Sequence, residues 1–223
     1  MIDWSSVRSV FLDMDGTLLD LRYDNHFWLE HVPVRYAEVH GVDEAYARTQ
    51  LHERYRRWAG TLQWYSVDFW SEELGLDIGR LKEEVDHLIA VRPHVPQFLD
   101  ALRQSGRRIT LVTNAHLKSL TLKMARTGLA PRFDAIVTAH DLGYPKEHES
   151  FWPALQVVER FDRGCTLLVD DSLAVLAAAR AYGIAHLATI HRPDSGRPPQ
   201  DIGAFAGVES FGDIMPMCPP GQG

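Results

Sequence analysis

Five short apolar segments, spaced by stretches of helical length, constrain the fold of this chain more than any other feature. The segments are Ser9–Leu12, Ile109–Thr113, Ala135–Thr138, Thr166–Val169 and His186–Thr189. Helix-like segments precede or separate the last four: Val95–Ser105, Leu117–Thr127, Ser150–Arg160 and Ser172–Tyr182. Apolar strands that alternate with helices are typical of a parallel sheet covered on both faces. The pattern therefore predicts an α/β fold with a doubly wound, mostly parallel sheet.

The interval between the first two of these strands departs from this alternation. From Asp24 to Ala90 no strand pattern occurs, and four aromatic-rich segments of helical length follow one another: Asn25–His40, Asp43–Trp58, Tyr65–Leu74 and Gly79–Ile89. They predict a helical cap, residues 20–92, inserted after the first strand into a core formed by residues 1–19 and 93–223. Leu19–Tyr23 and Arg92–Pro96 are the expected connections between cap and core.

Composition and charge limit the classes of partner. The net charge of −7 in 223 residues argues against a protein that binds a nucleic-acid polymer, since such proteins need a basic surface. No segment approaches the ~20 apolar residues that cross a bilayer, and the N-terminus lacks a signal-peptide pattern. Cys165 and Cys218 have no metal-ligand or disulfide spacing. These features predict a cytoplasmic protein without a membrane partner, either a monomer or a homodimer.

Reactive side chains follow several of the predicted strands. Asp13 and Asp15 come after the first strand, where alternation puts both on one side. The second strand ends in Thr113-Asn114, the fourth is followed by Asp170-Asp171, and the loop after the third carries Lys146. Ligands of open α/β sheets bind beyond the carboxyl ends of the strands. These residues are therefore expected to meet in one crevice.

This set of residues supports phosphoryl transfer. One carboxylate can attack phosphorus to give an aspartyl-phosphate, and a second can serve as general acid and base. Hard oxygen ligands favour Mg²⁺, while a hydroxyl and an ammonium stabilise the transferring phosphoryl group. Simpler alternatives exist for each part. An Asp-x-Asp pair can be a solvated turn, and Thr113-Asn114 or Asp170-Asp171-Ser172 can cap the helices that follow.

The motifs Asp13-Met14-Asp15-Gly16-Thr17, Thr113-Asn114, Lys146 and Asp170-Asp171-Ser172 resemble, in order, those of the haloacid dehalogenase-like hydrolase superfamily. The resemblance implies a Rossmann-like sheet with a helical cap. It also implies a division of roles: Asp13 as nucleophile, Asp15 as general acid/base, and Thr113 and Lys146 as phosphoryl-binding residues. Asn114 is a further expected substrate-binding residue. The implied cofactor is Mg²⁺, with Asp13, Asp15 (through its carbonyl), Asp171 and, in support, Asp170 as ligands.

Longer strings resemble the bacterial GMP/IMP nucleotidase branch of that superfamily: LLDLRYDNHFW (18–28), LQWYSVDFWSEELGLDI (62–78), VTNAH (112–116) and GYPKEHESFW (143–152). This resemblance implies hydrolysis of a purine nucleoside 5′-monophosphate. Asn25 and His26 are expected to face the cleft, and His116 to lie near it, whereas the aromatic residues of the cap are expected to form its packing core. A phosphoglycolate or sugar-phosphate phosphatase, a phosphomutase and a non-catalytic scaffold remain alternatives.

Overall fold

A computed structural model describes residues 2–216 and contains a single six-stranded parallel sheet. Its strands are β1 (Ser9–Leu12), β2 (Arg108–Thr113), β3 (Ala135–Thr138), β4 (Thr166–Val169), β5 (His186–Ile190) and β6 (Ala206–Val208), in the order β3-β2-β1-β4-β5-β6. The predicted α/β class and parallel sheet are confirmed. Because the strand order reverses between β1 and β4, the crevice for a ligand lies at the carboxyl ends of these two strands.

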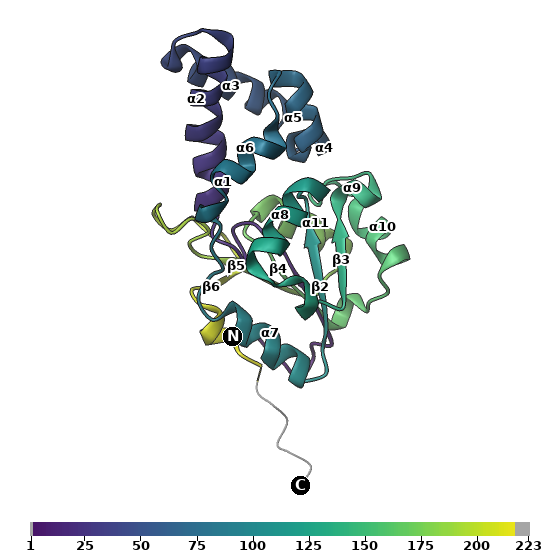
Figure 1. The fold of residues 1–223 in the computed structure, drawn as a ribbon. Helices are drawn as coiled ribbons and strands as arrows, with labels where there is room; N and C mark the ends of the chain where they lie inside the picture. The colour runs from purple at the N-terminus through teal and green to yellow at the C-terminus, as the bar shows by residue number, and fades with distance from the viewer. Residues whose placement is uncertain (1, 217–223) are drawn as a thin grey trace.

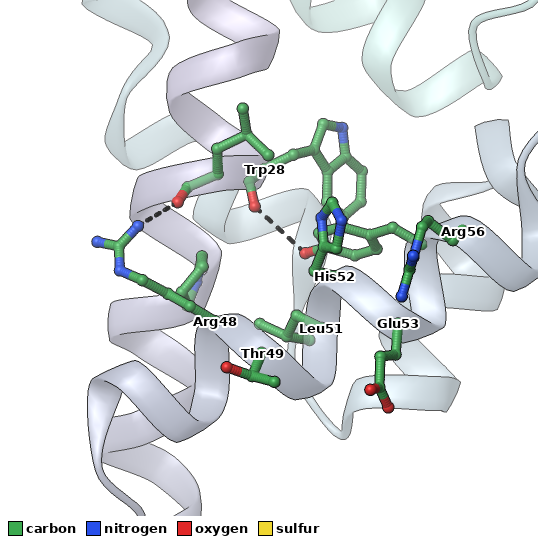
Figure 2. Close-up of a pocket in the computed structure, with 10 residues that line it drawn as sticks. Trp28, Arg48, Thr49, Leu51, His52, Glu53 and Arg56 are labelled. Carbon is green, nitrogen blue, oxygen red and sulfur yellow. Dashed lines mark hydrogen bonds between the residues drawn. The ribbon is translucent and has the colours of Figure 1, made fainter.

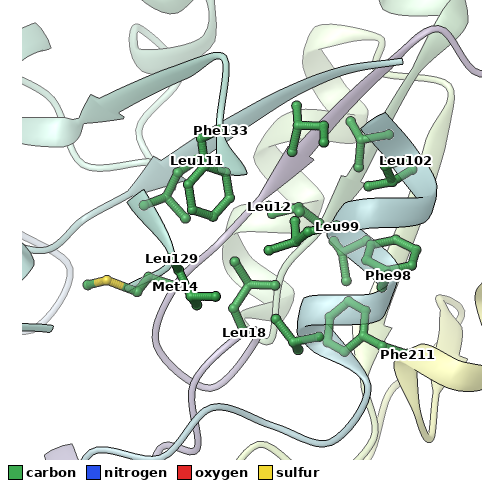
Figure 3. Close-up of a cluster of buried hydrophobic side chains, with 14 of the residues drawn as sticks. Leu12, Met14, Leu18, Phe98, Leu99, Leu102, Leu111, Leu129, Phe133 and Phe211 are labelled. Carbon is green, nitrogen blue, oxygen red and sulfur yellow. The ribbon is translucent and has the colours of Figure 1, made fainter. Parts of the chain in front are cut away.

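Helices cover both faces of the sheet (Figure 1). On one face α7 (Val95–Gln104), α8 (Leu117–Thr127) and η5 (Phe211–Ile214) enclose a cluster that contains Leu12, Phe98 and Leu111 (Figure 3). On the other face α10 (Phe151–Val158) and α11 (Leu173–Tyr182) pack around Phe11. Neighbouring residues of β1 thus enter opposite clusters, as strand alternation requires. The short elements η3 (Ala130–Arg132), α9 (Ala139–Leu142) and η4 (Arg163–Cys165) complete the core.

The chain between β1 and α7 is helical and is called here the helical insert. It contains α1 (Arg22–His26), η1 (Phe27–His31), α2 (Val32–His40), α3 (Glu44–Trp58), α4 (Leu62–Tyr65), α5 (Val67–Leu74), α6 (Ile78–Glu84) and η2 (Asp86–Leu88). A hydrophobic cluster of its own, with Phe27 and Trp70 fully buried, holds it together. Figure 1 shows the insert standing above the sheet. The helix-rich character of this interval therefore agrees with the sequence pattern.

One long helix of the insert contains a π turn. The elements α1, η1 and α2 follow one another without a break, and η1 is the π segment. Pro33 at the start of α2 has no N–H for the carbonyl of Leu29, and Arg48 of α3 donates to that carbonyl instead. The helix begins at Arg22 rather than at the expected Asn25, so Asp24 belongs to its first turn.

Two antiparallel segments join the insert to the sheet. Leu19 and Val91 form an isolated antiparallel bridge. The amide of Asp20 donates to the carbonyl of Ala90 at 2.9 Å, and the amide of Arg92 donates to the carbonyl of Leu18 at 3.0 Å. The segment that leaves the core and the segment that returns to it therefore lie side by side.

Two smaller observations concern the sequence expectations. None of the helices within residues 2–216 combines the length and the apolar character that a membrane span requires. Cys165 is a free thiol, whereas Cys218 lies outside the described residues.

Candidate active site

The predicted site residues meet at the carboxyl ends of β1, β2 and β4. A cavity of about 200 Å³ opens there. Its lining includes Asp13, Asp15, Thr113, Asn114, Lys146, Asp170 and Asp171. Asn25 is the one predicted substrate-binding residue that lies elsewhere, in an adjoining cavity. The strand-end pattern thus locates one site that combines four carboxylates with a hydroxyl, an ammonium and an amide.

Lys146 is the electrostatic centre of this cavity. Its buried ammonium donates to Asp13 Oδ1 at 2.5 Å, to Asp170 Oδ2 at 2.6 Å and to the carbonyl of Val112 at 3.1 Å. All three N–H donors of the side chain are therefore satisfied. The backbone N–H of Lys146 donates to Asn114 Oδ1 at 2.8 Å. Asn114 thereby fastens the loop that carries Lys146 to the end of β2.

The three strand-end carboxylates next to Lys146 are crowded and desolvated. Burial raises the pKa of Asp13 to about 6, and the charge of Asp170 adds to this effect while Lys146 opposes it. Burial, reinforced by Asp13 and Asp170, also raises the pKa of Asp171 well above its usual range. Burial lowers the pKa of Lys146, but its two carboxylate partners more than reverse this, so the pKa is raised overall. The surplus of negative charge favours binding of a further cation.

The donor set fits Mg²⁺. Asp13, Asp170 and Asp171 each offer a ligand atom, and these atoms lie within 4.8 Å of one another. No hydrogen bond to the carboxylate of Asp171 is recorded among the described residues, so its oxygens are available to a metal. Carboxylate oxygens are the ligands that Mg²⁺ prefers. The sequence expectation of a magnesium site therefore agrees with the chemistry of these side chains.

Gly16 allows Asp171 to approach. It has a φ of +78°, and a Cβ on it would lie 2.4 Å from Asp171 Oδ2. Only glycine adopts this backbone conformation readily and also leaves the space free. The turn after Asp15 and the position of the Asp171 carboxylate are thus linked.

Asp15 belongs to a buried network of charges that extends into the helical insert. Lys123 of α8 donates to Asp15 Oδ1 at 2.7 Å and to the two oxygens of Asp24 at 2.9 and 2.7 Å. Lys82 of α6 approaches Asp24 Oδ1 at 3.4 Å. Burial raises the pKa of Asp15 to about 6, and Asp24 raises it further while Lys123 lowers it. Burial also acts to raise the pKa of Asp24, but Lys123 and Lys82 reverse this and lower it overall.

The sequence interpretation missed Asp24, Lys82 and Lys123. A signal was nevertheless present, since both lysines occupy apolar-face positions of their helices. Lys82 follows Ile78 by four residues, and Lys123 follows Leu120 by three, and all four side chains are buried. A lysine at such a position needs a buried partner.

Glu147, the residue after Lys146, was also missed. It accepts hydrogen bonds from Asn114 Nδ2 at 2.9 Å and from the hydroxyl of Tyr65 at 2.9 Å. Tyr65 ends α4 of the insert, and burial raises its pKa, with the charge of Glu147 adding to the effect. The contact therefore connects the insert to the loop that carries Lys146.

A second cavity of about 300 Å³ adjoins the first. The two share Asp15, Leu21 and Tyr65. The remaining lining comes mostly from the insert and is rich in aromatic side chains: Asp24, Asn25, Trp28, Leu29, Tyr55, Trp64, Val67, Lys82 and Ser119. Asp15 thus lies where a polar, carboxylate-lined cavity meets an aromatic one.

Of the three residues expected to face the cleft or lie near it, only Asn25 lines one of these two cavities. Asn25 lines the aromatic cavity and donates through its amide to Asp194 Oδ2 at 2.6 Å. His26 contacts Glu30 at 3.1 Å on the surface of its own helix. His116 precedes α8 and lies 3.7 Å from Asp68 of the insert. Of these, Asn25 is the residue best placed to contact a ligand.

A third hollow, of about 400 Å³, is lined by residues of the helical insert (Figure 2). It shares Trp28, Leu29 and Tyr55 with the aromatic cavity and is otherwise formed largely by α3, including Arg48 and His52. It contains none of the strand-end residues. Tyr55 fixes its wall by donating to the carbonyl of Trp28 at 3.3 Å. The reactive groups therefore belong to the other two cavities.

Comparisons with known proteins agree with this geometry. Residues 7–183 match the haloacid dehalogenase-like hydrolase family. The chain is 40% identical over 215 residues to the GMP/IMP nucleotidase YrfG of Escherichia coli, covering 96% of this chain and 97% of that protein. It is 35% identical over 122 residues to a phosphoglycolate phosphatase of Nitrosospira multiformis, covering 53% of this chain and 52% of that protein.

Among solved structures, a HAD phosphatase from Thermococcus onnurineus has a TM-score of 0.78 at 22% identity, over 93% of this chain and 96% of that one. This likeness shows a similar fold over most of the chain. The family resemblance inferred from the four motifs, and with it the prediction of an enzyme, is confirmed. The chain belongs to the haloacid dehalogenase-like hydrolase family.

Proposed function

We propose that this hydrolase is a Mg²⁺-dependent phosphatase of nucleoside 5′-monophosphates, with GMP and IMP as preferred substrates. The observation that carries the proposal is the position of Asp15 at the junction of two cavities. A general acid must contact the oxygen that joins the phosphoryl group to its leaving group. The carboxylate-lined cavity suits the phosphoryl group, and the aromatic cavity suits a nucleoside.

The size and lining of the aromatic cavity favour a nucleoside over a small acid. A volume of about 300 Å³ lies at the lower end of the range typical of small-molecule sites, and a glycolate group would leave most of it empty. Trp28 and Trp64 in its wall supply flat apolar surfaces of the kind on which bases stack. The YrfG relative, which matches almost the full chain, is named for GMP and IMP. Its likeness supports the same substrate class here.

Asp13 is the proposed nucleophile. One oxygen of its carboxylate attacks phosphorus, the bond from phosphorus to the leaving oxygen breaks, and the protonated carboxyl of Asp15 gives its proton to that oxygen. Thr113 Oγ1 accepts a hydrogen bond from the N–H of Ala115 at 3.0 Å, so its own O–H is free to donate to the phosphoryl group. Lys146 and this hydroxyl stabilise the negative charge that develops on the phosphoryl oxygens.

The second half of the reaction releases phosphate. Asp15, now ionised, accepts a proton from water, the water oxygen forms a bond to phosphorus, and the bond from Asp13 to phosphorus breaks. Asp13 and Asp15 then return to their starting states. Mg²⁺ held by Asp13, Asp170, Asp171 and the carbonyl of Asp15 would neutralise charge between the carboxylates and the phosphoryl group.

The helical insert is the proposed cap, residues 20–92, over a core of residues 1–19 and 93–223. Two of its polar contacts with the core are Tyr65 with Glu147 and Asp24 with Lys123. Both contacts lie beside the reacting groups. Closure over a bound nucleotide would exclude bulk water and hold Asp15 against the leaving oxygen.

Initial-rate assays of the purified protein with Mg²⁺ and a panel of phosphate esters test the proposal. The panel includes IMP, GMP, AMP, phosphoglycolate and a sugar phosphate. We expect the highest kcat/KM with GMP and IMP and loss of turnover in Asp13→Asn. Best turnover of phosphoglycolate or a sugar phosphate would contradict the nucleotide assignment, and full activity of Asp13→Asn would contradict the mechanism. Transfer of the phosphoryl group from Asp13 to another hydroxyl oxygen of the substrate, instead of to water, would identify a phosphomutase.

A further inference from the structure

Lys82 is a buried cation that the proposed hydrolysis does not use. It lies on α6, its side chain is 3% exposed, and it lines the aromatic cavity. An ammonium has three N–H donors. Among the described residues, the hydrogen bond recorded for this one goes to Asp24 Oδ1 at a long 3.4 Å. Donors of Lys82 therefore remain for a ligand in the cavity.

The other neighbours of the Lys82 ammonium are aromatic rings. Its Nζ lies 4.3 Å from the ring centroid of Phe27, 5.2 Å from that of Tyr23 and 5.4 Å from that of Trp28. Ring faces attract a cation, but they do not replace a directed oxygen acceptor. A buried ammonium in such surroundings gains free energy from a ligand that brings an acceptor.

Lys82 also differs in sign from the other charged groups of this cavity. The charged residues that line it are Asp15, Asp24 and Lys82. Asp15 and Asp24 already share the ammonium of Lys123. Lys82 is thus the cationic donor offered to whatever occupies the aromatic cavity.

We infer that Lys82 donates a hydrogen bond to the carbonyl at position 6 of a purine base held beside Trp28, and that it thereby selects 6-oxopurine nucleotides over 6-aminopurine nucleotides. The inference rests on the proposed function and adds the specificity-determining residue. GMP and IMP both carry an acceptor at this position, whereas AMP carries an amino group. Since an ammonium has no lone pair, AMP would place donor against donor. A site built around a hydrogen bond discriminates strongly against a ligand that cannot make it.

The test compares kcat/KM for IMP with kcat/KM for AMP in the wild type and in Lys82→Met, which keeps the length of the side chain. We expect the IMP-to-AMP ratio to fall about tenfold or more, the range for a lost hydrogen bond to a charged donor. Arg80→Met removes an exposed cation from the same helix and should keep the wild-type ratio. If Lys82 only neutralises Asp24, both substrates lose activity together, the ratio stays constant, and the inference is overturned.

A second test changes the substrate and uses only the wild-type protein. Purine riboside 5′-monophosphate lacks the group at position 6. We expect the wild type to hydrolyse it with a kcat/KM about tenfold or more below that for IMP, and equal values would overturn the inference. Absence of turnover with every nucleotide and every other ester would instead refute the proposed function, so the two failures are distinguishable.

Discussion

Removing the ammonium of Lys123 should cost this protein a large part of its stability. The side chain is 1% exposed and pairs with Asp15 and Asp24, which are 24% and 18% exposed. Lys123→Met leaves two neighbouring carboxylates without their shared cation. Loss of one partner from a buried ion pair costs about 3–5 kcal/mol. Because both carboxylates retain some contact with water, we expect the lower end, about 3 kcal/mol. For a chain of this length that corresponds to a fall in Tm of about 6–12 °C.

The loss should depend on pH in a direction that the structure fixes. Lys123 lowers the pKa values of Asp15 and Asp24 in the folded state. Stabilisation from a lowered carboxyl pKa is present at high pH and is lost as pH falls. In the wild type the pKa of Asp15 is about 6, so this carboxyl is mostly neutral at pH 5 and ionised at pH 8. The difference in Tm between wild type and Lys123→Met should therefore be larger at pH 8 than at pH 5.

Differential scanning calorimetry at the two pH values, in buffers of equal ionic strength without Mg²⁺, measures this difference. Lys118→Met is the matched control, since Lys118 lies on the same helix and pairs with Asp68 at 2.5 Å with both side chains more than half exposed. Exposed pairs contribute little, so this control should melt like the wild type. Equal losses at both pH values, or a loss in Lys123→Met no larger than in the control, would refute the reasoning.

Three further predictions concern the site. Gly16→Ala places a methyl group 2.4 Å from Asp171 Oδ2, so Mg²⁺ affinity measured by calorimetry should fall about tenfold or more with the circular dichroism spectrum preserved; unchanged affinity would contradict the role of this glycine. Mg²⁺ must displace the proton from Asp13, whose pKa is about 6, so affinity should rise as pH increases from 5 to 7, and a flat profile would speak against Asp13 as a ligand. Tyr65→Phe removes the hydrogen bond to Glu147 and should raise KM for IMP about 2- to 10-fold with little change in Tm; an unaltered KM would exclude a role in substrate closure.

The sheet and the meeting of the strand-end residues in one cavity could be predicted because they follow from strong local patterns. The first, third and fourth strands have the expected bounds, and β2 and β5 differ by one residue at one end. Continuous apolar runs define such buried strands, and the residues directly after them meet by geometry alone. The edge strand β6, Ala206–Val208, was missed. Three small residues carry no periodicity, and the pairing with β5 is what makes them a strand.

The charge network could not be predicted in the same way, because its partners are distant in the sequence. Lys123 contacts Asp15 and Asp24 across about a hundred residues, and nothing local distinguishes it from a surface lysine except its place among apolar neighbours. The start of the first helix of the insert was also predicted three residues too late, which hid the role of Asp24 in the network. With a start at Asn25, Asp24 belongs to a connection, whereas the observed start at Arg22 turns it toward the buried lysines.

The pairing of the two connecting segments at Leu19 and Val91 affects how easily the helical insert could be exchanged for another segment. The ends of the helical insert are hydrogen-bonded neighbours, so the core meets the insert as it would meet a single hairpin loop. Loops with adjacent ends tolerate large insertions. A different helical segment with equally close ends could be grafted between Asp20 and Ala90 without moving β1 or the residues that follow it. The joint therefore gives this protein a natural site for exchanging the helical insert while the strand-end residues of the core stay in place.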